Sequence, residues 1–139
     1  MLGQTLPDYE LFIYALRDDY LSIQMSTLTV IRQARDVATV EGELLFHNGL
    51  RLSILEVVRF DLTPPRLTRY GYEVWRGNEK LYWYDSQSHP DDPALAITHP
   101  HHKHVPPDIK HHRIPAPELS FTRPNLPALI EEVERLANS

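Results

Sequence analysis

The sequence predicts an α+β fold, in which an antiparallel sheet of about five strands in largely meander order carries an N-terminal and a C-terminal helix and a long His/Pro-rich loop. Three observations indicate this fold. Amphipathic helical patterns lie near both ends, residues 21–60 are rich in Val, Ile, Leu and Thr, and a later alternating stretch is broken by a short turn. With 139 residues and 42% hydrophobic composition, the chain is expected to form a single domain, residues 1–139.

The first predicted element is a helix over residues 7–20. Pro7 suits a first helical turn, and Asp8 and Glu10 are favourable near a helix N-terminus. An apolar stripe recurs at helical spacing and consists of Tyr9, Phe12, Ile13, Leu16 and Tyr20. This stripe is expected to pack on the sheet.

Strands are predicted over residues 22–32, 36–46 and 50–60, and the last two form a hairpin. A three-residue loop over 47–49, with Gly49 in the left-handed conformation, keeps the apolar side chains of both strands on one face. This register pairs Phe46 with Leu50, Leu44 with Leu52 and Ala38 with Val58.

The same register has a consequence for Glu56. It places this carboxylate in one row with Ile54, Val58 and Phe60, where it needs a hydrogen-bond partner or a water-filled cleft.

A second hairpin is predicted over residues 66–85, with a two-residue turn at Gly77-Asn78. The turn predicts that Val74 pairs with Leu81, Tyr72 with Trp83 and Tyr70 with Asp85. Asp85 then ends an aromatic row at the point where the chain enters a His-rich segment. A carboxylate in that position can orient a histidine.

The His-rich segment runs from Asp85 to His112. Residues 89–112 contain seven of the eight histidines and five prolines, at 90, 93, 100, 106 and 107, so no regular element is expected there. A loop of more than twenty residues indicates a function rather than a simple connection. After it, Asn125 is expected to cap a helix with an apolar face made of Leu126, Leu129, Ile130, Val133 and Leu136.

Within this segment, the core string is His99-Pro100-His101-His102-Lys103-His104. In extended backbone His102 and His104 share a face, while His101 and Lys103 lie opposite. Two imidazoles backed by Asp85 or Glu56 suit general acid and base work near neutral pH, beside a cation that stabilises a phosphoryl group. The same imidazoles could instead bind zinc, nickel or copper.

The sequence lacks a helical His-Glu-x-x-His motif, and it has no cysteine, so the metal alternative depends on histidine density alone. No cofactor is expected. If a divalent transition metal does bind, the candidate ligands are His89, His99, His102 and His104.

Composition restricts the function classes. A net charge of −5 argues against a protein that coats nucleic acid by bulk electrostatics, but it does not exclude a local basic groove. No apolar stretch has the length of a membrane span, the start lacks the pattern of a signal peptide, and a chain without cysteine has no disulfides. We therefore expect a cytoplasmic protein with no membrane partner.

Four segments resemble the TumE family of toxin–antitoxin toxins, and the likeness covers most of the chain. They are Leu52-Ser53-Ile54-Leu55-Glu56, Tyr70-Gly71-Tyr72, Tyr84-Asp85 with His89, and Pro100-His101-His102-Lys103-His104-Val105. Members often carry an Arg before the Tyr-Asp pair and an Asn-Ala-Pro-like stretch after it, where this chain has Trp83 and Ser86-Gln87-Ser88. The resemblance implies a prokaryotic toxin that is neutralised by an antitoxin encoded beside it, often a small DNA-binding protein.

The leading hypothesis is a toxin that cleaves RNA, as a ribonuclease-like hydrolase or phosphotransferase. Its predicted catalytic residues are His102, His104, Asp85 and Glu56, and its predicted substrate-binding residues are Lys103, Arg59 and His101. One alternative is a non-catalytic binding protein or regulator whose His-rich loop contacts a partner, and another is a metal-binding accessory domain. The expected partners are the antitoxin and RNA, and a homodimer stays open.

Overall fold

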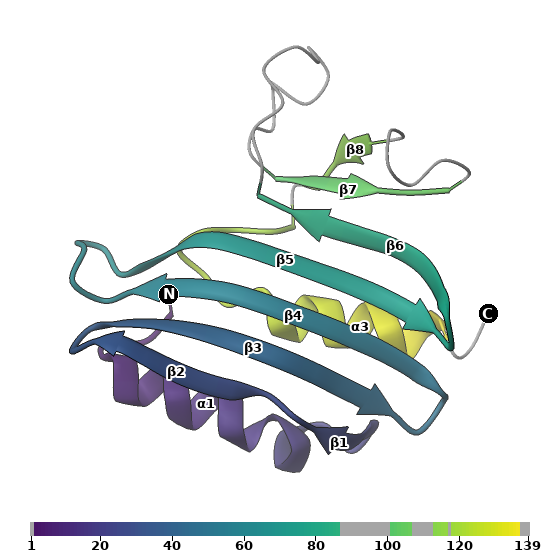
Figure 1. The fold of residues 1–139 in the computed structure, drawn as a ribbon, viewed down its shortest axis with the longest axis horizontal. Helices are drawn as coiled ribbons and strands as arrows, with labels where there is room; N and C mark the ends of the chain where they lie inside the picture. The colour runs from purple at the N-terminus through teal and green to yellow at the C-terminus, as the bar shows by residue number, and fades with distance from the viewer. Residues whose placement is uncertain (1, 87–100, 107–112, 117, 137–139) are drawn as a thin grey trace.

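An antiparallel eight-stranded sheet with two helices makes up the computed structural model, which describes residues 2–86, 101–106, 113–116 and 118–136 (Figure 1). The elements are α1 (Leu6–Asp19), β1 (Ile23–Ser26), β2 (Thr29–Ala34), β3 (Val37–Phe46), β4 (Leu50–Arg59), β5 (Arg66–Arg76), β6 (Glu79–Asp85), β7 (His102–His104), β8 (Arg113–Pro115) and α3 (Leu126–Leu136). The α+β class is confirmed.

The sheet follows the predicted meander. The strand order is β1-β3-β4-β5-β6-β7-β8, and β2 also pairs with β3, so each strand from β3 onward lies beside its neighbour in sequence. Both helices pack on one face of this sheet, α1 near the β1–β3 end and α3 behind β4 to β6 (Figure 1). The opposite face of the sheet is covered by neither helix, and we call it the open face.

The sheet has more strands than the expected five, for two reasons. The predicted strand 22–32 is split into β1 and β2, where the backbone of Thr27 passes so close to Gly42 that a Cβ on this glycine would lie 2.6 Å from the Thr27 carbonyl oxygen. The expectation of no regular element in the His-rich segment was also wrong. The three-residue strand β7 lies within this segment, between its prolines. β8 follows directly after the segment and ends at Pro115, and both strands extend the sheet beyond β6.

The helices begin and pack largely as their sequences indicate. Thr5 caps α1 in a reciprocal box, because its hydroxyl accepts from Asp8 N and the Asp8 carboxylate accepts from Thr5 N. The side chains that the helices bury against the sheet are Leu6, Tyr9, Ile13 and Leu16 of α1 and Leu126, Leu129, Ile130 and Val133 of α3. In the described part of the chain, neither helix is long and apolar enough to cross a membrane.

The β3–β4 hairpin has the predicted register. Leu44 pairs with Leu52 and Ala38 with Val58, and Gly49 has the expected positive φ of 87°. Glu56 accordingly points to the helix-covered face, as side-chain parity requires.

The predicted register of the β5–β6 hairpin was wrong by one residue. Its Gly77-Asn78 turn is present, but a β-bulge between Val74 and Trp75 pairs Val74 with Tyr82, Tyr72 with Tyr84 and Gly71 with Asp85. A one-residue shift moves every later side chain of a strand to the other face. Tyrosines 82 and 84 are therefore buried beneath α3, while Trp83 and Asp85 lie on the open face.

The cap predicted at Asn125 is also wrong, since its side chain turns away from α3. Its Oδ1 accepts from Ser120 N at 2.8 Å, and its Nδ2 donates to Tyr72 Oη at 3.1 Å and to the Ser120 carbonyl at 3.0 Å. The backbone carbonyl of Asn125 still accepts the first helical bond, from Leu129 N. Asn125 thus fastens the chain before α3 to the buried tyrosines.

Candidate functional site

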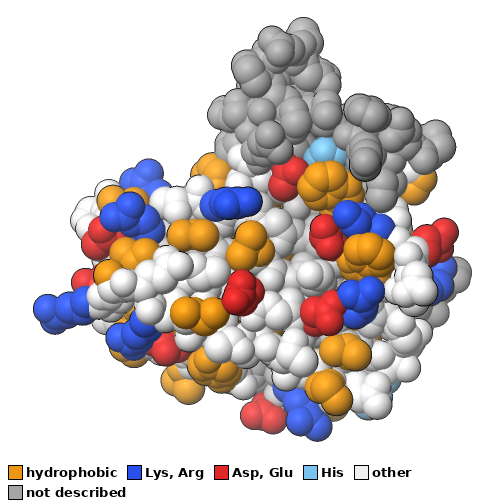
Figure 2. Space-filling view, in the orientation of Figure 1, with side chains coloured by type: hydrophobic (Ala, Val, Ile, Leu, Met, Phe, Trp, Pro, Cys, Tyr) orange, Lys and Arg blue, Asp and Glu red, His pale blue; other side chains and the backbone are white. Residues whose placement is uncertain are grey.

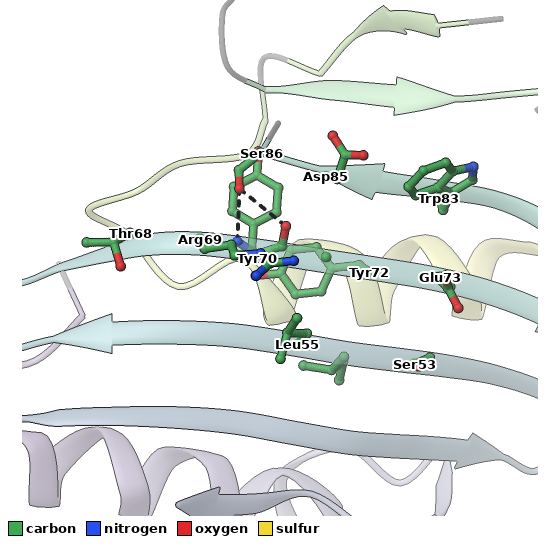
Figure 3. A pocket seen from close by; sticks show the side chains of 12 residues that line it. Ser53, Leu55, Thr68, Arg69, Tyr70, Tyr72, Glu73, Trp83, Asp85 and Ser86 are labelled. Carbon is green, nitrogen blue, oxygen red and sulfur yellow. Dashed lines mark hydrogen bonds between the residues drawn. The ribbon is translucent and has the colours of Figure 1, made fainter. Parts of the chain in front are cut away.

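A groove of about 700 Å³ crosses the open face over β4, β5 and β6 (Figure 3). Gly71 forms its floor, and a Cβ built on this glycine would meet nothing within 4 Å. The open-face side chains around this floor are Ser53, Leu55, Arg69, Glu73, Trp83 and Asp85. The missing side chain of Gly71 therefore leaves room for a ligand between a cation, two carboxylates and an indole ring.

His104 and Asp85 meet at the β6–β7 end of this groove. The strands pair Trp83 with His104 and Asp85 with His102. Nε2 of His104 lies 3.3 Å from Oδ2 of Asp85, and the imidazole stacks on the Trp83 ring with 3.7 Å between centroids. The His104 residue is 2% exposed, so the ring is held by its surroundings. A carboxylate beside a fixed imidazole orients the ring.

The other histidines of the string are placed differently. His101 lies on the helix-covered face, where it stacks on Tyr70 and its Nδ1 shares a hydrogen bond with the Tyr70 hydroxyl. Burial, and then the charge of Asp85, raises the pKa of the Tyr70 hydroxyl, which keeps it protonated. The backbone of His102 belongs to β7, and its side chain lies outside the described residues.

Lys103 lies on the opposite face of β7 from His104, as strand alternation predicts. Its ammonium group sits 4.1 Å from the centre of the Tyr82 ring and 3.5 Å from a carboxylate oxygen of Glu132, which also accepts from the Tyr84 hydroxyl. The structure therefore brings Lys103 into a cation–π and ionic contact with α3, away from the groove.

Glu56 is buried on the helix-covered face and does not approach Asp85. It is 0% exposed, and the hydroxyls of Tyr9 and Tyr72 each donate to one of its oxygens at 2.5 Å. Burial raises the pKa of Glu56, and the two hydroxyl donors offset part of that rise. This carboxylate has the partners that its position demanded, and it joins α1, β4 and β5.

The raised pKa of Glu56 predicts how stability depends on pH. The folded state holds the Glu56 proton more tightly than the unfolded chain does, so this stabilisation is complete below the ordinary value of 4.5 and is lost as the pH rises through the folded-state pKa. We expect the thermal midpoint of wild type, relative to Glu56→Gln, to fall as the pH is raised above 4.5. The exposed Glu131→Gln change is the control, and a parallel course of wild type and Glu56→Gln with pH would contradict this prediction.

The cationic residues proposed from the sequence, Arg59 and Lys103, do not line the groove, whereas Arg69 does. Arg59 is partly exposed at the end of β4 and pairs with Asp61. Arg59 lies four residues along β4 from Leu55. Leu55 pairs with Gly71, and Gly71 pairs with Asp85, so Arg59 is displaced from Asp85 by about 13 Å along the strand direction. Arg69 lines the groove instead, and its side chain makes no hydrogen bond or ion pair within the described residues.

Sequence reasoning missed Arg69, Trp83 and Gly71 as site residues. Arg69 and Gly71 share a face by strand alternation, and Trp83 joins them through the bulge in β6, which no local pattern in the sequence marked. A glycine between two tyrosines in an otherwise aromatic strand was an available signal, because glycine within a strand often marks the close approach of a ligand or of another backbone.

The metal hypothesis stays a prediction. Among the described residues, no group of three or more His, Cys, Asp or Glu side chains is placed to hold a metal ion. His89 and His99 lie outside those residues, as does the side chain of His102.

Comparison with known proteins assigns the family. The family model described as Toxin TumE matches residues 15–137. No curated protein and no solved structure matches the chain significantly. The matched range includes the groove, His104, Asp85 and both buried tyrosine pairs of the second hairpin. The chain therefore belongs to the TumE toxin family.

Proposed function

We propose that this toxin cleaves RNA where the groove meets His104 and Asp85. The observation that carries the proposal is the 3.3 Å approach of His104 Nε2 to Asp85 Oδ2 beside an open groove. Family membership gives the chain the role of a toxin with an antitoxin as its partner. Cleavage of RNA is the reaction that we add, because an oriented imidazole next to a cation suits phosphoryl transfer.

The proposed reaction needs no group beyond RNA and the chain. The ribose 2′-hydroxyl attacks the adjacent phosphorus, the bond from phosphorus to the 5′-oxygen breaks, and the products end in a 2′,3′-cyclic phosphate and a 5′-hydroxyl. A base takes the 2′ proton, and an acid gives a proton to the departing 5′-oxygen. His104, beside Asp85, is the candidate for one of these two proton transfers.

Two further groups complete the proposal. His102 is the candidate for the second acid or base, because its backbone pairs with Asp85 in the sheet. Arg69 is the candidate for the phosphate, since it lines the groove while Arg59 and Lys103 are held elsewhere. A planar guanidinium matches the oxygens of a phosphate.

The first test compares Asp85→Asn with Asp18→Asn, an exposed carboxylate of α1, after induction in bacteria without antitoxin. We expect wild type and Asp18→Asn to arrest growth and fragment RNA with cyclic-phosphate ends. Asp85→Asn should lower the cleavage rate of the purified protein by about 10²-fold or more, because the imidazole loses the carboxylate that orients it.

Growth arrest with intact RNA would contradict RNA cleavage and would favour a toxin that works by binding. Cleavage at the wild-type rate by Asp85→Asn would remove Asp85 from the proposed mechanism. Circular dichroism on each variant establishes that the compared proteins are folded.

A further inference from the structure

Aromatic and cationic side chains alternate across the open face from His104 to β4. His104 stacks on Trp83, the Lys80 ammonium lies 5.0 Å from the Trp83 ring and 5.3 Å from the Trp75 ring, and the Arg51 guanidinium lies 4.9 Å from the Trp75 ring on its β4 side. We call these five residues the ladder. Figure 2 shows hydrophobic side chains interleaved with basic and acidic ones over this part of the face.

The turn at Gly77-Asn78 and the bulge in β6 together create the ladder. The turn pairs Trp75 with Lys80, and β4 pairs Trp75 with Arg51, so the indole is flanked by a cation from each adjacent strand. Leu81 is the extra residue of the bulge, and it brings Trp83 onto the same face as Trp75. Glu73 fixes this arrangement, because one of its oxygens accepts from Trp75 Nε1 at 3.1 Å and the other lies 3.1 Å from the Lys80 ammonium. Both tryptophans of the chain belong to the ladder.

The charges along the ladder are nearly balanced. Arg51 pairs with Glu43 and Lys80 pairs with Glu73, and the two cationic side chains keep 30% and 26% of their surface exposed. Partly exposed Lys and Arg side chains can leave an indole face and reach a phosphate, which frees the ring for another planar group. The ladder therefore suits planar, weakly charged contacts better than a dense row of phosphates.

From this geometry we infer that the ladder is a binding track for single-stranded RNA and leads the strand to His104. Unpaired bases stack on indole rings, and the paired cations follow the backbone beside them. Duplex RNA hides its bases, so the ladder has no stacking contact to offer it. This inference rests on the proposed RNA-cleaving function and adds the form of RNA and the path by which it reaches the groove.

The test measures binding separately from cleavage by using the His104→Gln protein throughout. Oligoadenylate is titrated into this protein while tryptophan fluorescence is followed, and a hairpin duplex of equal length is the comparison. We expect fluorescence quenching by the single strand and at least about fivefold weaker binding after Trp75→Ala, because stacking on one aromatic ring has about that effect or more. Trp75→Phe should keep most of the affinity, since phenylalanine retains a stacking face.

Salt dependence gives a second readout. Arg51 and Lys80 already have carboxylate partners in the free protein. The slope of the logarithm of the RNA association constant against the logarithm of the salt concentration should therefore be no steeper than about −2, the value for three neutralised phosphates on a single strand. Tyr14→Ala removes an exposed aromatic side chain of α1 and should leave RNA binding unchanged.

The outcomes separate this inference from the proposed function. If Trp75→Ala removes RNA binding from the His104→Gln protein while the wild-type protein cleaves no RNA, the track is supported and the cleavage proposal is overturned. Cleavage by wild type with unchanged RNA binding after Trp75→Ala overturns the track alone. Equal affinity for duplex and single-stranded RNA also overturns the track. So does a Trp75→Ala change that weakens neutralisation by the antitoxin and leaves RNA binding unchanged.

Discussion

Replacing His104 with glutamine is expected to lower the rate of RNA cleavage by about 10² to 10⁴-fold, the usual contribution of a positioned proton-transfer group. Glutamine is similar in length and polar, so it can still lie against Trp83 and face Asp85, but it cannot exchange a proton near neutral pH. The measurement is single-turnover cleavage of a labelled single-stranded RNA by purified protein. Growth after induction gives the cellular counterpart, in which His104→Gln should no longer arrest the cells.

The matched control is His47→Gln, because His47 is exposed in the β3–β4 loop. This change should leave the cleavage rate within about twofold of wild type, as surface substitutions away from a site do. The position of His104 next to Trp83 allows a check of folding by tryptophan fluorescence and circular dichroism. A folded His104→Gln protein that cleaves RNA as fast as His47→Gln would show that this imidazole takes no part in the reaction.

The sequence was sufficient to predict features that depend on side-chain parity over short distances. The β3–β4 register follows from keeping Leu44 and Leu52 on one face, and the separation of Lys103 from His104 follows from strand alternation. Family membership, which was predicted from strings that include the His101–His104 segment, is also confirmed.

The choice between Glu56 and Asp85 could not be made from the sequence, because it depends on the bulge at Trp75. Without the bulge, Tyr72 pairs with Trp83 and Asp85 joins the aromatic core row. With it, Tyr82 and Tyr84 are buried, and Tyr84 reaches Glu132 on α3. This contact joins residues 48 positions apart in the chain, and no local pattern reports such a contact.

β7 in the His-rich segment and β8 directly after it could not be predicted for a related reason. β7 and β8 are each three residues long and lie close to prolines that remove backbone donors. A strand this short is stable only beside an existing sheet edge, which β6 supplies. Groove residues such as Gly71 and Arg69 then become neighbours of His104 only through tertiary structure.

Replacing Glu56 with alanine is expected to cost about 2–4 kcal/mol of unfolding free energy, a large part of what a domain of this size has. The change leaves a cavity and removes the acceptor of two buried hydroxyls, those of Tyr9 and Tyr72. It also removes the cost of burying a carboxylate, which keeps the loss below the sum of the separate effects. Urea unfolding followed by circular dichroism measures it, and a double-mutant cycle with Tyr9→Phe should give a coupling of about 1 kcal/mol.

Glu56→Gln separates stability from function at this position. The amide keeps an oxygen that can accept from one tyrosine, so the protein should be more stable than Glu56→Ala and should cleave RNA as wild type does. Asp85→Asn should show the reverse, with near wild-type stability and a large loss of cleavage, because Asp85 faces the groove and Glu56 faces the helices. Loss of cleavage in a stable Glu56→Gln protein would instead assign catalysis to the buried carboxylate, and would require the reaction to take place on the helix-covered side of the sheet.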